Sequence, residues 1–138
     1  MKKSRGFSME RFFLALGDRT RLRLLNLMSD REICVCYFVE VLGQSQPKIS
    51  RHLAYLRNAG IVSARREGRW IHYRIAQPPS PAAALVLRET LVWLRDQRQM
   101  QSDMALLMKI CSDPEKLIAI GNAPVPWRQR FFNSLGVR

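Results

Sequence analysis

Three cysteines carry the most distinctive chemistry in this sequence: Cys34, Cys36 and Cys111. A thiolate is a soft ligand that prefers soft or thiophilic ions, whereas Mg²⁺ and Ca²⁺ prefer oxygen. An odd number of cysteines, two of them one residue apart, does not fit the disulfide framework of a small secreted domain. The thiols therefore point to metal or metalloid binding, to redox sensing, or simply to burial in a core.

Cys34 and Cys36 belong to a short apolar segment, residues 33–42, which by periodicity alone fits either a strand or a buried helix. The next segment favours the helix, because Ser45 can cap a new helix and Pro47 suits its first turn. Two short helices joined by the turn at Gly43 predict a helix-turn-helix. The thiols would then lie near the start of its first helix, where the positive end of the helix dipole lowers thiol pKa values.

The spacing of these two cysteines makes a further prediction. Residues i and i+2 lie about 200° apart around an α-helix, so two such thiols cannot readily close on one atom. We therefore expect chelation to distort or unwind this turn and to shift the second helix, with the ~1–3 kcal/mol of coupling usual in allostery. Cys111 is far downstream, so only tertiary or dimer contacts would bring it to the pair.

The second helix, residues 47–58, has two different faces. Ile49, Leu53 and Leu56 recur at helical spacing and should face the core. The opposite face offers cations and hydrogen-bond donors but no carboxylate, which suits a DNA groove. Its members are Lys48, Ser50, Arg51, Ala54 and Tyr55.

A β-hairpin is predicted after this helix, because β-branched and aromatic residues flank the turn at Glu67-Gly68. Its tip carries Arg65, Arg66 and Arg69, as expected of a wing beside a helix-turn-helix. The whole chain has a formal net charge of +12, and residues 45–75 alone hold seven cations and one acid. Half of the net charge thus lies where we infer DNA contact.

The remaining segments predict a mainly α fold. Helices are expected at 9–16 and, capped by Asp18, up to Met28; a long one follows at about 82–111. The apolar spacing of the long helix favours pairing with a second copy, and packing on its own domain is the alternative. We assign residues 1–112 to a DNA-binding and dimerisation domain. Residues 113–138 form a tail, partly ordered at most, in which Trp127, Phe131 and Phe132 favour docking of one part on the body.

Several classes of protein are disfavoured. No stretch approaches the roughly 20 apolar residues that span a bilayer, and the basic N-terminus lacks the apolar run of an export signal. We expect a cytoplasmic protein without a membrane partner. The sequence has no Ser-His-Asp order, phosphate loop, Gly-rich fingerprint or HExxH motif, so we expect no enzyme.

Four motifs in order resemble the ArsR/SmtB family of metalloregulatory repressors, over roughly residues 9–76. They are ALGDRTRLRLL (15–25), EICVC (32–36), QPKISRHL (46–53) and LRNAGIV (56–62) followed by REGRW (66–70). The resemblance implies a homodimeric winged helix-turn-helix, paired through its terminal helices. It also implies repression by binding to double-stranded operator DNA, and release when a metal or metalloid binds.

The sequence around Cys34 and Cys36 is similar to the arsenic-responsive branch, whose cysteines at this motif bind As(III) or Sb(III). That branch often has a third cysteine three residues after the second, where this chain has Val39. Cys111 is the remaining candidate for a third ligand, and an inert buried cysteine is the alternative. Without it, the two-thiol site would suit a methylated or aryl trivalent arsenical as inducer, and no permanently bound cofactor is expected.

Two alternatives stay within the same fold. One is a thiol redox or persulfide sensor, although a disulfide between Cys34 and Cys36 would be strained. The other is a cadmium or zinc sensor, although Asp96 and Asp103 in the long helix have no accompanying histidine, and residues 1–33 contain no cysteine.

For the DNA contact, we expect a dimer to meet two half-sites about one helical turn apart. Lys48, Ser50 and Arg51 should reach base edges, while Arg65, Arg66 and Arg69 approach phosphates. The predicted set is completed by Gln46, His52 and Tyr55.

Overall fold

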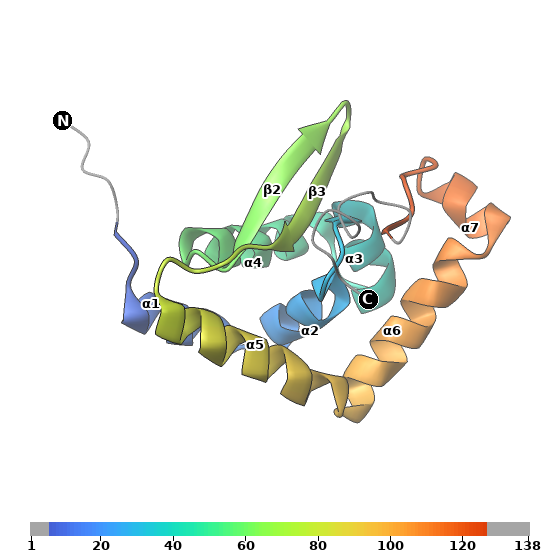
Figure 1. Cartoon of the computed structure of the whole chain (residues 1–138). Helices are drawn as coiled ribbons and strands as arrows, with labels where there is room; N and C mark the ends of the chain where they lie inside the picture. Colours follow the sequence, from blue (N-terminus) through green and yellow to red (C-terminus); the bar gives the residue numbers. More distant parts are fainter. Residues whose placement is uncertain (1–5, 127–138) are drawn as a thin grey trace.

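The computed structural model describes residues 6–126, in which a helical body carries a projecting β-hairpin (Figure 1). The elements in chain order are α1 (Met9–Leu16), α2 (Arg19–Met28), β1 (Ile33–Cys34), α3 (Val35–Leu42), α4 (Gln46–Asn58), β2 (Val62–Glu67), β3 (Trp70–Ile75), α5 (Pro81–Arg95), α6 (Arg98–Cys111) and α7 (Pro114–Ala119). The predicted mainly α fold with a small hairpin is confirmed.

Helices α3 and α4 form the predicted helix-turn-helix. Gly43 ends α3 in the left-handed conformation, φ 67° and ψ 29°, and its N–H donates to the Val39 carbonyl at 2.9 Å. Pro47 lies in the first turn of α4, as predicted, and Ser45 occupies the N-cap; among the described residues its side chain makes no capping hydrogen bond. Ile49 and its partners Leu53 and Leu56 are fully buried, which orients α4 against the core.

The hairpin belongs to a three-stranded antiparallel sheet of the described residues, in the order β1-β3-β2. Gly68 supplies the positive φ, 60°, that the tight turn requires. Strand β1 pairs Cys34 with His72 of β3. Residues 33–42 are therefore not one helix: the first two form strand β1 beside β3, and only the rest is helical. The extended conformation of residues 33 and 34 depends on their long-range pairing with β3. Local periodicity carries no information about that pairing.

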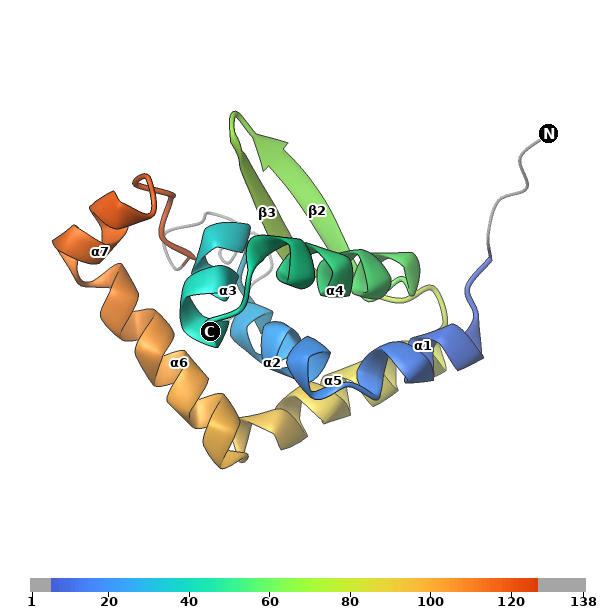
Figure 2. The ribbon, with the colours of Figure 1, turned by 180° about the vertical axis from the view of Figure 1, so that it is seen from behind.

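The predicted long helix at 82–111 is wrong as a single rod. The helix is interrupted at Asp96 and Gln97, so α5 and α6 meet at an angle below the body (Figures 1 and 2). Helix α6 packs back on α2, where Asp103 accepts two hydrogen bonds from Arg23 at 2.7 and 2.9 Å. Asn26 also donates to the Met100 carbonyl at 3.0 Å. These polar contacts hold α6 on its own domain. Helix α5 exposes four large apolar side chains, Leu85, Val86, Val92 and Trp93.

The chain after α6 returns to the body. Tyr37 of α3 donates its hydroxyl to the Ala123 carbonyl at 2.7 Å, and the side chains of Ala123 and Val125 are buried. Trp127, Phe131 and Phe132, on which the predicted docking of the tail rested, lie outside the described residues. The boundary at residue 112 stays a prediction. Within residues 6–126, no helix is long and apolar enough to cross a membrane.

Candidate metalloid site and DNA-facing surface

Cys34 and Cys36 lie side by side at the start of α3. Cys34 is the N-cap residue and has an extended backbone, φ −75° and ψ 147°, because it also ends β1. The extended residue turns the Cys34 side chain toward Cys36, and the two sulfur atoms are 3.4 Å apart. The premise that both cysteines are helical is therefore wrong, and the 200° separation does not apply to this pair. That chelation distorts this turn stays a prediction.

The pKa values of the two thiols are shifted in opposite directions. The Cys36 thiol donates a hydrogen bond to Cys34 sulfur, and this bond lowers the pKa of Cys34 to about 6 against the opposing effect of burial. The same bond, together with burial, raises the pKa of Cys36 above its ordinary range. The pair thus holds one thiolate near neutral pH, which is the form that attacks a thiophile or binds a soft metal.

Cys111 lies at the end of α6, where it is buried, and burial raises its pKa to about 12. Within residues 6–126 of one chain, no three His, Cys, Asp or Glu side chains are grouped so that they could hold a metal ion. The structure therefore brings Cys34 and Cys36 together but does not bring Cys111 to them.

The outer side of α4 is exposed as predicted: Gln46, Lys48, Ser50, Arg51 and Tyr55 all face solvent. His52 differs, because it is partly buried with its Nδ1 3.3 Å from Arg21 Nη1 and 3.7 Å from an Asp18 oxygen. Burial is the main cause that lowers the pKa of His52. Arg21 also stacks over the Tyr55 ring at 4.1 Å, so His52 and Tyr55 have contacts of their own within the protein.

The wing arginines are not equivalent. Arg65 donates to both carboxylate oxygens of Glu32 at 2.9 and 2.7 Å, and Arg69 donates to the Gly121 carbonyl at 2.8 Å. The Arg66 side chain makes no hydrogen bond or ion pair with any part of the chain that the structure describes. The sequence placed all three at a DNA-contacting tip, and two of them have partners inside the protein.

Sequence reasoning missed two acids that organise the wing. Glu32 is buried before β1 and binds Arg65, which lowers the pKa of Glu32. Glu67, expected only as a turn residue, lies 2.7 Å from Nε2 of the buried His72. The signal was present in part, because Glu67 is the only acid among residues 45–75; nothing local marked Glu32.

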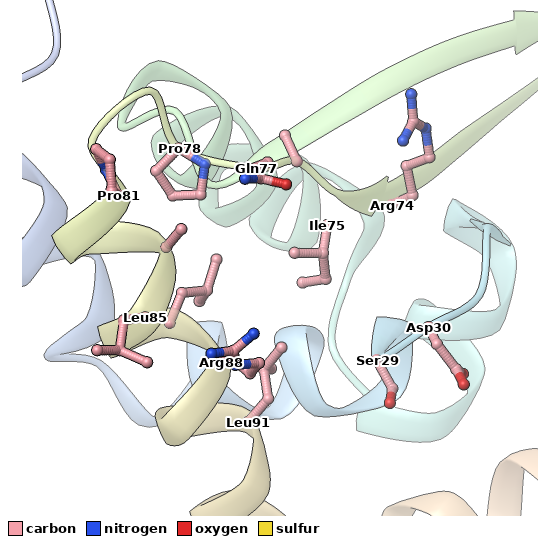
Figure 3. Close-up of a pocket in the computed structure, with 13 residues that line it drawn as sticks. Ser29, Asp30, Arg74, Ile75, Gln77, Pro78, Pro81, Leu85, Arg88 and Leu91 are labelled. Atoms are coloured by element: carbon pink, nitrogen blue, oxygen red, sulfur yellow. The ribbon is translucent and has the colours of Figure 1, made fainter. Parts of the chain in front are cut away.

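A separate cavity of about 550 Å³ lies between α5, β3 and the end of α2. Leu85, Arg88 and Leu91 of α5 border it on one side, and Ile75 and Ser29 lie across from them (Figure 3). Its lining contains no thiol, and one side of it is formed by α5.

A helix-turn-helix with an exposed basic second helix and an adjacent hairpin defines a winged helix-turn-helix DNA-binding regulator. The model of the bacterial regulatory proteins of the arsR family matches residues 18–64. The chain is 43% identical over 109 residues to the arsenical resistance operon repressor of Escherichia coli K12, covering 77% of this chain and 91% of that protein. It is 41% identical over 99 residues to the arsenic resistance regulator ArsR2 of Pseudomonas putida, covering 70% and 83%. The chain therefore belongs to the arsR family, and it is a transcriptional regulator and not an enzyme.

Solved structures agree with this assignment. HlyU from Vibrio cholerae aligns with a TM-score of 0.54 and 30% identity, over 64% of this chain and 91% of that one. The homodimeric winged helix-turn-helix DNA-binding domain of Mb0332 from Mycobacterium bovis aligns with a TM-score of 0.52 and 29% identity, over 64% and 83%.

Proposed function

We propose that this protein is a homodimeric transcriptional repressor that leaves its operator when trivalent arsenic or antimony, inorganic or organic, binds Cys34 and Cys36. The observation that carries the proposal is the 3.4 Å separation of these two sulfur atoms at the N-terminus of α3. Two adjacent thiols, one of them ionised near neutral pH, form a pair of soft ligands that can chelate a thiophilic ion. The similarity to arsenic-resistance regulators supports the same assignment.

The position of the pair supports its coupling to DNA. Cys34 is shared by β1, which pairs with wing strand β3, and by the cap of α3, which packs against α4. Bonds from both sulfurs to one atom would replace the Cys36-to-Cys34 hydrogen bond and fix this junction. Because the wing and α3 both meet at this junction, a change in its geometry on binding would reach the wing and the DNA-facing helix together. Coupling of the usual ~1–3 kcal/mol would weaken operator binding about 5- to 150-fold per site.

The dimer would form through α1 and α5. Both helices expose large apolar side chains, among them Phe13 on α1, 51% exposed, and Trp93 on α5, 69% exposed. Such side chains on a chain of this size favour a protein interface over free solvent. A two-fold dimer would place its two α4 helices in successive major grooves of the operator.

Release of operator DNA tests the proposal directly. Arsenite, antimonite, methylarsonous acid, cadmium and zinc are titrated into the protein–operator complex, with fluorescence anisotropy as the readout. We expect release by the arsenic and antimony compounds, and loss of that response in Cys34→Ser and Cys36→Ser. Cys111→Ser is the matched control, because its thiol is buried away from the pair. Normal release from a Cys34→Ser/Cys36→Ser double variant would overturn the proposal.

The acidified pair also favours a second function, a redox or persulfide sensor. An oxidant or a persulfide donor would then release the operator in the absence of arsenicals. Mass spectrometry of the protein after mild oxidation distinguishes the two, because the sensor would carry a modified Cys34 or a linked Cys34 and Cys36 at the dose that releases DNA.

A further inference from the structure

A cavity of about 310 Å³ opens directly beside the thiol pair. Cys34 and Cys36 form part of its lining, and most of the remaining wall is apolar. The apolar lining consists of Val35, Val39, Trp70, Ile71 and Ile120, and the polar lining consists of Glu40, Gln46 and Arg69. Its volume is at the lower end of the roughly 300–1,000 Å³ typical of small-molecule sites. We call it the thiol cavity.

The protein offers trivalent arsenic two ligands here, not three. Arsenic in this state forms three bonds, and within residues 6–126 no group of three His, Cys, Asp or Glu side chains could hold a metal ion. Glu40 also lines the cavity, but it offers hard carboxylate oxygens, one of which lies 3.8 Å from Lys116 Nζ. The third position must therefore be filled by a group that arrives with the ligand. Val39, three residues after Cys36 and so on the same side of α3, presents an apolar surface to that position.

We propose that the thiol cavity binds the organic substituent of a monosubstituted trivalent arsenical, so that organoarsenicals are preferred over arsenite. This inference rests on the proposed function, because it needs arsenic bound to Cys34 and Cys36. In the step, R–As(OH)₂ exchanges both hydroxyls for the two sulfurs. Two As–S bonds form and two As–O bonds break. One hydroxyl leaves as water with the Cys36 proton, and the other leaves as water with a proton from solvent, because Cys34 is already a thiolate. Arsenic stays trivalent and no electron is transferred.

The wall of the cavity explains how a bulky substituent would reach the DNA-binding surface. Besides α3, it includes Gln46, the first residue of α4, Trp70 of the wing, and Ile120 after α7. Arg69 also borders the cavity, and its hydrogen bond to the Gly121 carbonyl joins the wing to the segment after α7. A group that fills the cavity therefore contacts α3, the first residue of α4, the wing at Trp70 and the segment after α7.

A series of three ligands on the reduced protein tests the preference: arsenite, methylarsonous acid and phenylarsine oxide, which hydrates to the dihydroxy form. The readouts are operator release and quenching of tryptophan fluorescence, because Trp70 lines the cavity. We expect the half-release concentration to fall from arsenite to the methyl to the phenyl compound, by about 10-fold or more across the series. Equal concentrations for all three would overturn the inference while leaving the proposed function intact.

Two variants sharpen the test. Val39→Cys adds a third thiol and should improve arsenite at least 10-fold while removing the advantage of the phenyl compound. Ile118→Cys is its control, because this side chain is 66% exposed on α7 and does not line the cavity. Ile120→Trp should fill the cavity and weaken the phenyl compound at least 5-fold with arsenite unchanged, operator binding without ligand serving as the check on folding.

The outcomes separate the two proposals. If no arsenical releases DNA in a Cys34- and Cys36-dependent manner, the proposed function fails and this inference fails with it. If arsenicals release DNA but Val39→Cys and Ile120→Trp change all three ligands equally, only the inference fails.

Discussion

Helix α4 carries six of the predicted DNA contacts and the wing carries three, and the charged side chains of the two differ in their partners. On α4, the side chains of Lys48 and Arg51 are exposed and make no hydrogen bond or ion pair with any other described residue. On the wing, Arg65 is held by Glu32 and Arg69 by a backbone carbonyl. Cations without internal partners can contact DNA without first breaking a bond, whereas a paired arginine must give up its partner.

A count of basic residues therefore overstates how many wing arginines are available to contact DNA. Of its three tip arginines, Arg66 alone lacks a partner among residues 6–126. Arg65 links the hairpin to the residue before β1, which connects it to the chain segment that carries the thiols. We therefore interpret α4 as the surface that contacts bases, and the wing as an element whose position is set from within.

The sharpest way to break this comparison is Arg51→Ala on α4. Loss of a base-contacting arginine costs about 1–3 kcal/mol, so operator affinity should fall about 5- to 150-fold and discrimination against random DNA should relax. Anisotropy titration of operator and random duplexes at one salt concentration measures both. Lys109→Ala, exposed on α6, is the matched control. An unchanged affinity in Arg51→Ala would remove α4 from the interface.

Glu32→Gln tests whether the wing is held from within. The buried Glu32 carboxylate loses its ion pair with Arg65, whose side chain is 47% exposed and partly screened by solvent. The free energy of unfolding at neutral pH should fall by about 1–2 kcal/mol, while operator affinity stays the same or rises, because Arg65 is released.

The same variant should change the pH dependence of stability. The hydrogen bond from Arg65 lowers the pKa of Glu32 in the folded protein below its ordinary value of 4.5. The ion pair therefore stabilises the fold above that value, and the contribution disappears as the pH falls through the folded-state pKa. Urea unfolding at pH 7 and pH 3 should show the difference between wild type and Glu32→Gln shrinking at pH 3. A constant difference would contradict this assignment.

Arg66→Ala should have a smaller and less selective effect. A phosphate contact by one exposed arginine lowers affinity for every sequence alike, by about 3-fold, and reduces the slope of log affinity against log salt by about 1. Titrations of operator and random DNA at four salt concentrations give both numbers. A loss confined to the operator would indicate a base contact instead.

Arg69→Ala should have the smallest effect on DNA, less than about 2-fold, because this guanidinium donates to Gly121 and borders the thiol cavity. Anisotropy on the same duplexes suffices. An effect as large as that of Arg51→Ala would show that the carbonyl contact opens when DNA binds.

Local sequence signals predicted the framework well. Asp18 caps α2 by accepting from the Arg21 N–H at 3.0 Å, and the Ile49 stripe of α4 faces the core. These features depend on residues within one turn or on a single helical period, which the sequence displays directly. The family motifs predicted the fold and the class of function because they too are short local patterns that the sequence displays directly.

Long-range contacts account for what the sequence did not predict. The pairing of Cys34 with His72 makes Cys34 extended, and only that brings its sulfur to Cys36. The Arg65–Glu32 pair joins residues 33 positions apart. The break at Asp96 depends on contacts of α6 with α2, among them the one between Asp103 and Arg23. Apolar spacing alone extends a helix through such a point.

The preformed thiol pair also has a kinetic consequence. A ligand that meets both sulfurs already adjacent needs no prior rearrangement of the chain, because the receptive conformation is the resting one. The association rate should then rise in proportion to arsenical concentration, without the plateau that a slow opening step imposes. The response of the repressor to a sudden rise in arsenical would then be limited only by diffusion of the arsenical and by exchange of its hydroxyls for the two sulfurs.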